Sequence, residues 1–172
     1  QVGPESLYYH HGLRFAPDFV KKHISGKIFA DVGGWLGDSA LVFAGYSPEK
    51  IVVFEPDKNN RVKLEKTLKR NGISGDSYDL YPWGLSDSHT VSDGFECRPL
   101  DDISKDYTNL FGVLKADIEG MGTAFLRGAR GFLGLAGASS STTGASTTGA
   151  SSTRTTGVVR LLYRSMYLPA EL

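Results

Sequence analysis

One stretch near the N-terminus, residues 27–56, limits the chain to a small group of folds, because it has the pattern of a strand, a glycine turn, a helix and a second strand. Residues 28–32 are largely apolar, and Gly33, Gly34 and Gly37 follow them. Asp38 and Ser39 are residue types that favour a helix N-cap. Residues 51–54 form a continuous apolar run, as expected for a parallel strand buried on both faces. We therefore predict a βαβ unit within a doubly wound α/β fold.

The second predicted strand ends on an acid, Glu55, which Pro56 follows. In sheets of this kind, ligands bind beyond the carboxyl ends of the strands. Glycines let the backbone approach a ligand without interference from a Cβ atom, and a carboxylate accepts hydrogen bonds from the two hydroxyls of a ribose. The glycine turn and Glu55 therefore predict a site for a ribose-containing cofactor. The alternative is a generic βαβ turn in which Glu55 only ends a strand.

Two classes of cofactor use such a unit. The dinucleotide fingerprint G-x-G-x-x-G needs a glycine where this chain has Val32, which disfavours a nicotinamide dehydrogenase. The order Asp31, Gly33, Gly37 and then an acid that ends the next strand resembles the cofactor motif of class I S-adenosylmethionine-dependent methyltransferases. This chain departs from that motif at position 35, where a tryptophan replaces the usual middle glycine.

Residues 112–118 are predicted to form a buried strand, and a pair of acids stands at its end. Asp117 and Glu119 stand where a doubly wound sheet places its reactive groups, and burial side by side raises the pKa of one acid enough for it to accept a proton. The competing interpretation is a pair of acids that caps the helix expected from Met121 onward. Trp83 and Asp87 have two open interpretations, as an adenine site or as a core residue with a turn residue. The pair His10-His11 is interpreted as a solvated turn or a packed N-terminal lid, and the alternative is a base or substrate contact in the site.

Local patterns predict five further elements. A stripe of Phe15, Phe19, Val20 and Ile24 predicts a helix over residues 15–24 that packs on the sheet. Residues 58–70 are predicted to form a helix with Asp57 as its N-cap, and residues 77–85 to form a strand that ends in a loop at 82–84. A hairpin is expected around residues 92–94 and a short helix at residues 100–103.

Composition excludes several classes of function. The 172 residues contain 19 Lys and Arg against 19 Asp and Glu, so no basic excess indicates a nucleic-acid partner. No apolar stretch approaches the length of a membrane span, and no signal peptide or metal-binding cluster of Cys and His is visible. Cys97 is the single cysteine, which suits a reducing compartment, and we expect a cytoplasmic protein.

Five motifs occur together over residues 8–131: YYHHGL, DVGGWLGDSALVF, FEPDKNN, LDDI, and LKADIEGM followed by FLRGA. In this order and spacing they resemble the FkbM-type methyltransferases. The resemblance implies a class I methyltransferase fold with S-adenosylmethionine as cofactor and a hydroxyl of a sugar or natural product as acceptor. It implies that Asp117 and Glu119 lie near the transferred methyl group. It also implies that the cofactor is lined by Asp31, Gly33, Gly37, Asp38, Ser39 and Glu55. Gly122 stands where that family commonly has a further Glu.

The pattern changes after about residue 135. Residues 136–157 are Ser, Thr, Gly and Ala except for Arg154, which predicts a linker between a methyltransferase-like domain (1–135) and a C-terminal segment (158–172). The sheet is therefore expected to be incomplete on its C-terminal side, with an exposed edge that favours a homodimer or a substitute strand from residues 158–167. Two functions stay open: an O-methyltransferase, or a truncated module that binds the cofactor without turnover.

Overall fold

The computed structural model describes residues 12–107, 111–118, 121–133 and 162–163. The α-helices are α2 (Asp18–Ile24), α3 (Asp38–Ala44), α4 (Lys58–Arg70), α5 (Leu100–Ile103) and α6 (Gly122–Gly128). The strands are β1 (Ile28–Val32), β2 (Lys50–Phe54), β3 (Tyr78–Tyr81), β4 (Gly84–Leu85), β5 (Thr90–Ser92), β6 (Phe95–Arg98), β7 (Phe111–Ala116) and β8 (Leu162–Tyr163). Short 3-10 turns occupy Gly12–Phe15, Gly75–Ser77 and Ser104–Asp106.

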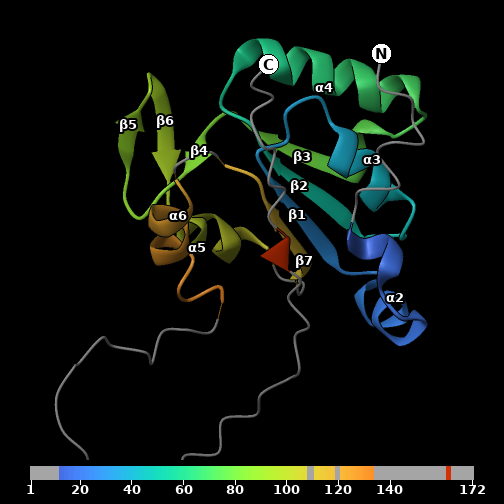
Figure 1. Cartoon of the computed structure of the whole chain (residues 1–172). Coiled ribbons are helices and arrows are strands. Elements are labelled where there is room, and N and C mark those ends of the chain that lie inside the picture. The colour runs from blue at the N-terminus through green and yellow to red at the C-terminus, as the bar shows by residue number, and fades with distance from the viewer. Residues whose placement is uncertain (1–11, 108–110, 119–120, 134–161, 164–172) are drawn as a thin grey trace, which may run out of the picture.

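A five-stranded parallel sheet with the order β3-β2-β1-β7-β8 forms the centre of the molecule (Figure 1). Helices cover both of its faces: α2, α3 and α4 pack on one side, and α5 and α6 on the other. Two hydrophobic cores result, one around Phe29, Phe43 and Leu64 and the other around Phe54 and Phe125. The predicted doubly wound α/β fold is therefore confirmed.

The βαβ unit has the predicted order and nearly the predicted bounds. One detail of the prediction was wrong, because the N-cap of α3 is Gly37, with a φ of 84°, and Asp38 is the first helical residue. The predicted helix over 58–70 is confirmed, including its cap: the side chain of Asp57 accepts a hydrogen bond from the Asn60 N–H at 2.9 Å.

The helix predicted over residues 15–24 starts later than expected, at Asp18. Pro17 precedes it, and a proline disfavours helical geometry in the residue before it, so residues 12–15 form a separate turn. The predicted apolar stripe is consequently only half right. Val20 and Ile24 are buried, whereas Phe15 and Phe19 are 74% and 72% exposed.

A smaller sheet with the order β4-β6-β5 lies beside the main sheet, on the side of α5 and α6 (Figure 1). Its β5–β6 hairpin confirms the predicted turn at 92–94, where Asp93 and Gly94 both have positive φ. The strand predicted over residues 77–85 is divided into β3 and β4 by the loop at Pro82 and Trp83, as expected from that proline.

At the other edge of the main sheet, β8 pairs in parallel with β7, so that Leu114 and Lys115 face Leu162 and Tyr163 in the register. The linker predicted at 136–157, the histidine pair at 10–11 and Glu119 lie outside the described residues.

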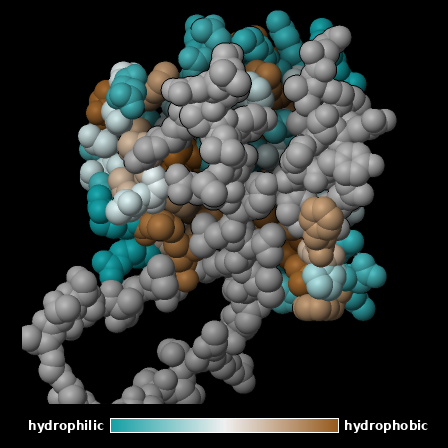
Figure 2. All heavy atoms as spheres, in the orientation of Figure 1, coloured by the Kyte–Doolittle hydropathy of each residue, from teal (hydrophilic) through white to brown (hydrophobic). Residues whose placement is uncertain are grey.

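Hydrophilic side chains gather over α4 at the top of the molecule in Figure 2, where the lysines of that helix are exposed.

Candidate functional site

The order of the strands places the candidate site. From β1 the chain moves outward to β2 and β3, and it then returns to the opposite side of β1 as β7. The topological switch point, where open α/β sheets bind ligands, therefore lies between β1 and β7. The register aligns the last residues of three strands, because Val32 pairs with both Phe54 and Ala116. The residues that follow them, Gly33, Glu55 and Asp117, consequently emerge at the same edge of the sheet.

The glycine turn is packed closely against the ends of β2 and β7. The N–H groups of Gly33 and Gly34 both donate to the Phe54 carbonyl, at 3.0 and 3.1 Å. Gly33 has a φ of 80°, and a Cβ atom at this position would lie 2.1 Å from the backbone oxygen of Asp117. Only glycine fits both this conformation and this approach.

Gly34 and Gly37 meet the core on the other side of the turn. A Cβ atom on Gly34 would lie 2.3 Å from Val53, and one on Gly37 would lie 3.1 Å from Leu64. The predicted glycines thus serve first to bring the turn close to its neighbours. Asp38 is half-buried at the start of α3, whereas Ser39 is 5% exposed and faces the interior.

The carboxylate of Glu55 points into the glycine turn. Its Oε2 accepts a hydrogen bond from the Trp35 N–H at 2.8 Å, and its Oε1 accepts one from the Asp57 N–H at 2.9 Å. A longer contact of 3.4 Å joins Oε1 to the side-chain amide of Asn60. Glu55 is 5% exposed. The relationship predicted between this acid and the turn is therefore present in the structure.

Trp35 occupies a backbone conformation that L residues rarely adopt, with a φ of 43°. This position is the one at which the sequence departs from the expected glycine, and the structure shows why glycine suits it. The Trp35 residue is 52% exposed, so its indole lies at the surface of the turn.

A buried ion pair lies beneath the turn. The Lys115 ammonium is 2.9 Å from Oδ1 of Asp31 and donates a hydrogen bond to the Gly33 carbonyl at 2.8 Å. Asp31 and Lys115 are register partners on β1 and β7, and they are 0% and 5% exposed. Neither Asp31 oxygen has a well-aligned hydrogen bond within the described part of the chain, so the lysine charge is its main compensation.

Burial dominates the ionisation of Asp31. The loss of water raises the pKa of its carboxyl from 3.8 to about 6; the lysine charge opposes this shift, and Asp38 and Asp117 add to it. Burial is the largest single effect on Lys115 and favours a lower pKa, but the charge and hydrogen bond of Asp31, together with the charges of Asp38 and Asp117, outweigh it and raise the Lys115 pKa. The two directions are compatible, because the ammonium keeps two oxygen partners while the carboxylate lacks well-aligned donors.

Lys115 did not appear among the residues predicted for the site. The available signal was a charged residue inside the otherwise apolar run 111–116. Asp117 follows β7, two residues after Lys115, and is half-buried. Its predicted partner Glu119 is outside the described residues.

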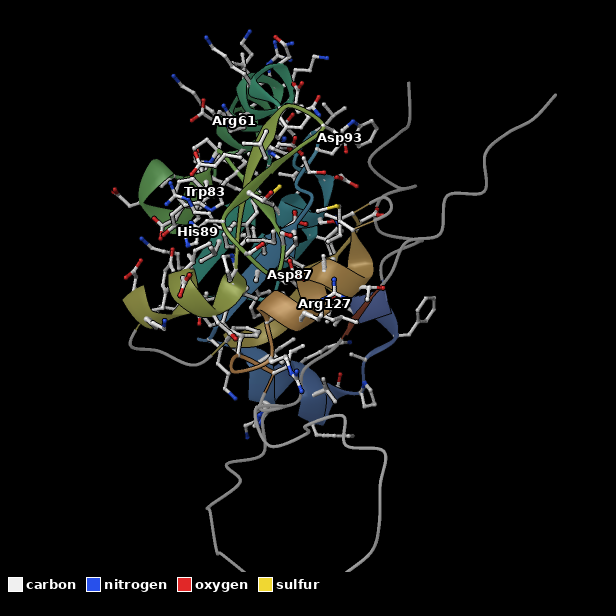
Figure 3. All side chains as sticks on the ribbon, turned by 90° about the vertical axis from the view of Figure 1, so that its left-hand side faces the viewer. Arg61, Trp83, Asp87, His89, Asp93 and Arg127 are labelled. Carbon is white, nitrogen blue, oxygen red and sulfur yellow. The ribbon has the colours of Figure 1, made fainter. Side chains whose placement is uncertain are left out.

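The predicted adenine-binding pair lies after β3. The carboxylate of Asp87 accepts a charge-assisted hydrogen bond of 2.7 Å from Arg127 of α6, which lowers the Asp87 pKa (Figure 3). The ring of Trp83 is half-buried between Tyr81 and the Arg98 guanidinium, which lies 3.8 Å from the ring centre. Asp87 thus already has a cationic partner from α6.

The described residues were also compared with the patterns of metal sites, membrane spans and surface hollows. Among them, no group of three or more His, Cys, Asp or Glu has the arrangement of a metal site, and no helix has the length and apolarity to cross a bilayer. A shallow hollow of about 590 Å³ between α4 and β3 is lined by Val62, Lys66, Lys69 and Tyr78, among others. None of its lining residues belongs to the glycine turn.

Comparison with known proteins identifies the fold. No protein-family model matches the sequence, and no curated protein matches it significantly. Among solved structures, the methyltransferase FkbM from Methylobacillus flagellatus is 25% identical, with a TM-score of 0.58 over 74% of this chain and 36% of that protein. An rRNA methylase from Streptococcus thermophilus is 15% identical, with a TM-score of 0.51 over 73% of this chain and 64% of that protein. A protein from Streptococcus mutans in complex with SAH is 14% identical, with a TM-score of 0.47 over 73% of this chain and 66% of that protein.

The predicted resemblance is therefore confirmed: the described domain has the Rossmann-like fold of class I methyltransferases and is similar to an FkbM methyltransferase. The chain spans about a third of the length of that methyltransferase.

Proposed function

We propose that this chain binds S-adenosylmethionine at the glycine turn and that it supplies the cofactor half of a methyltransferase. The observation that supports the proposal most directly is the placement of Glu55. A buried carboxylate directed at a glycine turn, at the switch point of a parallel sheet, has the position and chemistry needed to hold a ribose. The fold of the domain and its similarity to an FkbM methyltransferase are consistent with this cofactor.

The residues present fit the nucleoside. Within the described contacts, Oε2 of Glu55 accepts a single hydrogen bond, so it keeps a lone pair for a ribose hydroxyl. Hydrogen bonds to a charged, largely buried acceptor are stronger than neutral ones. The turn itself brings glycine backbone, without side chains at 33 and 34, to the edge where the ligand would lie.

When bound, S-adenosylmethionine supplies an electrophilic methyl group. The task of the chain is then to hold the donor and to place an acceptor oxygen in line with it, which is catalysis by orientation. Asp117 follows β7 at the same edge as Gly33, so in our proposal Asp117 or Glu119 accepts the proton of a small-molecule or glycan hydroxyl. The acceptor and the O-methyl specificity are part of the proposal.

Isothermal titration with S-adenosylhomocysteine tests the cofactor assignment, with NADH titrated in parallel. We expect binding of the nucleoside product and no binding of NADH. The reverse result would revive the nicotinamide alternative, and the absence of both would remove the proposed site.

A second candidate is a module that holds the cofactor but does not turn over. It is favoured by Gly122, which stands where the FkbM-type motif commonly has a further Glu. Release of S-adenosylhomocysteine in the presence of a panel of hydroxylated acceptors separates the two functions, because only an enzyme forms this product.

A further inference from the structure

We infer that Lys115 is a positioning residue: its ammonium fixes the glycine turn against β7 and so sets the geometry of the cofactor site. The consequence for cofactor binding rests on the proposed function, whereas the consequence for the turn itself does not. The inference depends on the contacts of one side chain that runs beneath the turn.

The Lys115 ammonium joins three parts of the fold. It lies 2.9 Å from Asp31 on β1, and it donates to the Gly33 carbonyl at 2.8 Å while its own backbone belongs to β7. Because Lys115 is only 5% exposed, little water is available to take the place of either partner. Loss of the ammonium would leave the Gly33 carbonyl without this donor.

An ion pair alone gives no reason for this arrangement. Buried ion pairs contribute little net stability compared with well-packed apolar residues of similar volume, because both charges lose their hydration. The carbonyl of Gly33 is the partner that an apolar pair would not satisfy. The role of Lys115 in this arrangement is therefore to hold the turn in place, and not to stabilise the core.

The candidate base directly follows the same strand. Asp117 lies two residues after Lys115, and its backbone contacts the turn region: its N–H donates to the Val32 carbonyl at 2.9 Å, and its carbonyl lies against Gly33. Lys115 therefore fixes the position of the turn, which would hold the donor, relative to β7, which the candidate base follows. A shift of about 1 Å between reacting groups is enough to reduce turnover strongly.

The test uses a variant that removes both charges together, Asp31→Leu with Lys115→Met, so that no unpaired charge stays buried. Amide hydrogen exchange is measured at Gly33 and Gly34, whose N–H groups bond to Phe54. Amides within β2 serve as the internal reference. Lys105→Met is the matched control, because Lys105 is an exposed lysine that pairs with Asp102.

We expect exchange at Gly33 and Gly34 to accelerate at least tenfold in the double variant, with β2 unchanged and with the control equal to wild type. Wild-type protection of the turn in the folded double variant would overturn the inference. If the double variant does not fold, Lys115→Met alone is measured at pH 5, where burial leaves Asp31 largely protonated. The same tenfold acceleration is expected there, and unchanged protection overturns the inference.

Affinity for S-adenosylhomocysteine is measured on the same samples. We expect the double variant to bind at least tenfold more weakly than the Lys105→Met control. If the wild type does not bind the nucleoside, the proposed function fails, while the exchange data still decide the role of Lys115. Equal affinity in the double variant and the control would show that the turn binds without this lysine and would overturn its positioning role.

Discussion

The N–H of Trp35 donates a hydrogen bond of 2.8 Å to Oε2 of Glu55, which joins the glycine turn after β1 to the residue that follows β2. The two residues are twenty positions apart in the chain, and the parallel register of β1 and β2 brings them together. The turn and the acid therefore form one unit, whose geometry is set before any ligand arrives.

Glu55→Gln tests whether this acid binds the ribose. The amide keeps the shape of the side chain but loses the charge that strengthens its hydrogen bonds, so we expect about tenfold weaker binding of S-adenosylhomocysteine. Thermal unfolding should also show a loss of about 1–2 kcal/mol, because the contacts with Trp35 and Asp57 weaken.

Glu65→Gln is the matched control, because Glu65 is an exposed acid on α4. It should leave the affinity unchanged. Equal affinity in the Glu55 variant and in the control would show that Glu55 serves only to stabilise the turn.

The stability of the chain should carry a signature of the buried Asp31. Its folded pKa of about 6 is raised above the ordinary 3.8, so between these values the folded state binds a proton that the unfolded state has lost. The contribution of this group is therefore fully present below the unfolded pKa of 3.8, and it is lost as the pH rises through 6. Across this window, the wild type should lose about 3 kcal/mol relative to Asp31→Asn.

Urea unfolding at half-unit steps from pH 4 to 7.5 measures this difference. A carboxylate whose ion pair outweighed its burial would have a lowered pKa, and the wild type would then gain stability relative to the variant as the pH rose. Such a gain would show that Lys115 compensates the charge of Asp31 more fully than burial penalises it.

Several elements follow from short-range patterns. The apolar run at 28–32, the cap at Asp57 and the turn at 93–94 are determined by residues close in the chain, and each was predicted correctly. Phe15 was misplaced because its helical spacing was counted through Pro17, whereas the helix begins after that residue. Lys115 was missed because its importance depends on Asp31 and on the carbonyl of Gly33, which only the strand order brings together.

Trp35 should carry measurable backbone strain. Its φ of 43° lies in the left-handed region, where a Cβ atom costs about 1–2 kcal/mol. Trp35→Ala keeps the Cβ atom and Trp35→Gly removes it, so the pair isolates the strain from the loss of the indole. We expect the glycine variant to be about 1 kcal/mol more stable than the alanine variant in urea unfolding. Equal stabilities would indicate that the turn relaxes to a negative φ when the indole is absent.

Asp87 should tolerate substitution, because its charged partner is Arg127 and its other contacts are long hydrogen bonds from the hydroxyls of Ser86 and Ser88. The carboxylate is exposed and pairs with an exposed arginine, and surface pairs contribute little to stability. Asp87→Asn and Arg127→Met should therefore each leave the unfolding midpoint nearly unchanged. If only Asp87→Asn loses affinity for S-adenosylhomocysteine, the adenine contact is supported. If Asp87→Asn binds S-adenosylhomocysteine as tightly as Arg127→Met does, the adenine contact is contradicted.

Gly33 should be the most sensitive position of the turn, and the chain offers a matched comparison. Gly33 and Gly26 have similar φ values of 80° and 70°, so alanine meets the same backbone cost of about 1 kcal/mol at both. At Gly26 the new Cβ atom meets nothing within 4 Å, whereas at Gly33 it would lie 2.1 Å from the Asp117 carbonyl oxygen. That oxygen is held by the hydrogen bond of its own residue to Val32, so the turn has to move instead.

We therefore expect Gly33→Ala to cost at least about 2 kcal/mol more than Gly26→Ala in urea unfolding. It should also abolish S-adenosylhomocysteine binding under conditions in which Gly26→Ala retains it. If both substitutions reduce the free energy of unfolding equally, the backbone at the end of β7 must move to make room for the new Cβ atom. The close approach of Gly33 to Asp117 would then not be a fixed feature of the site.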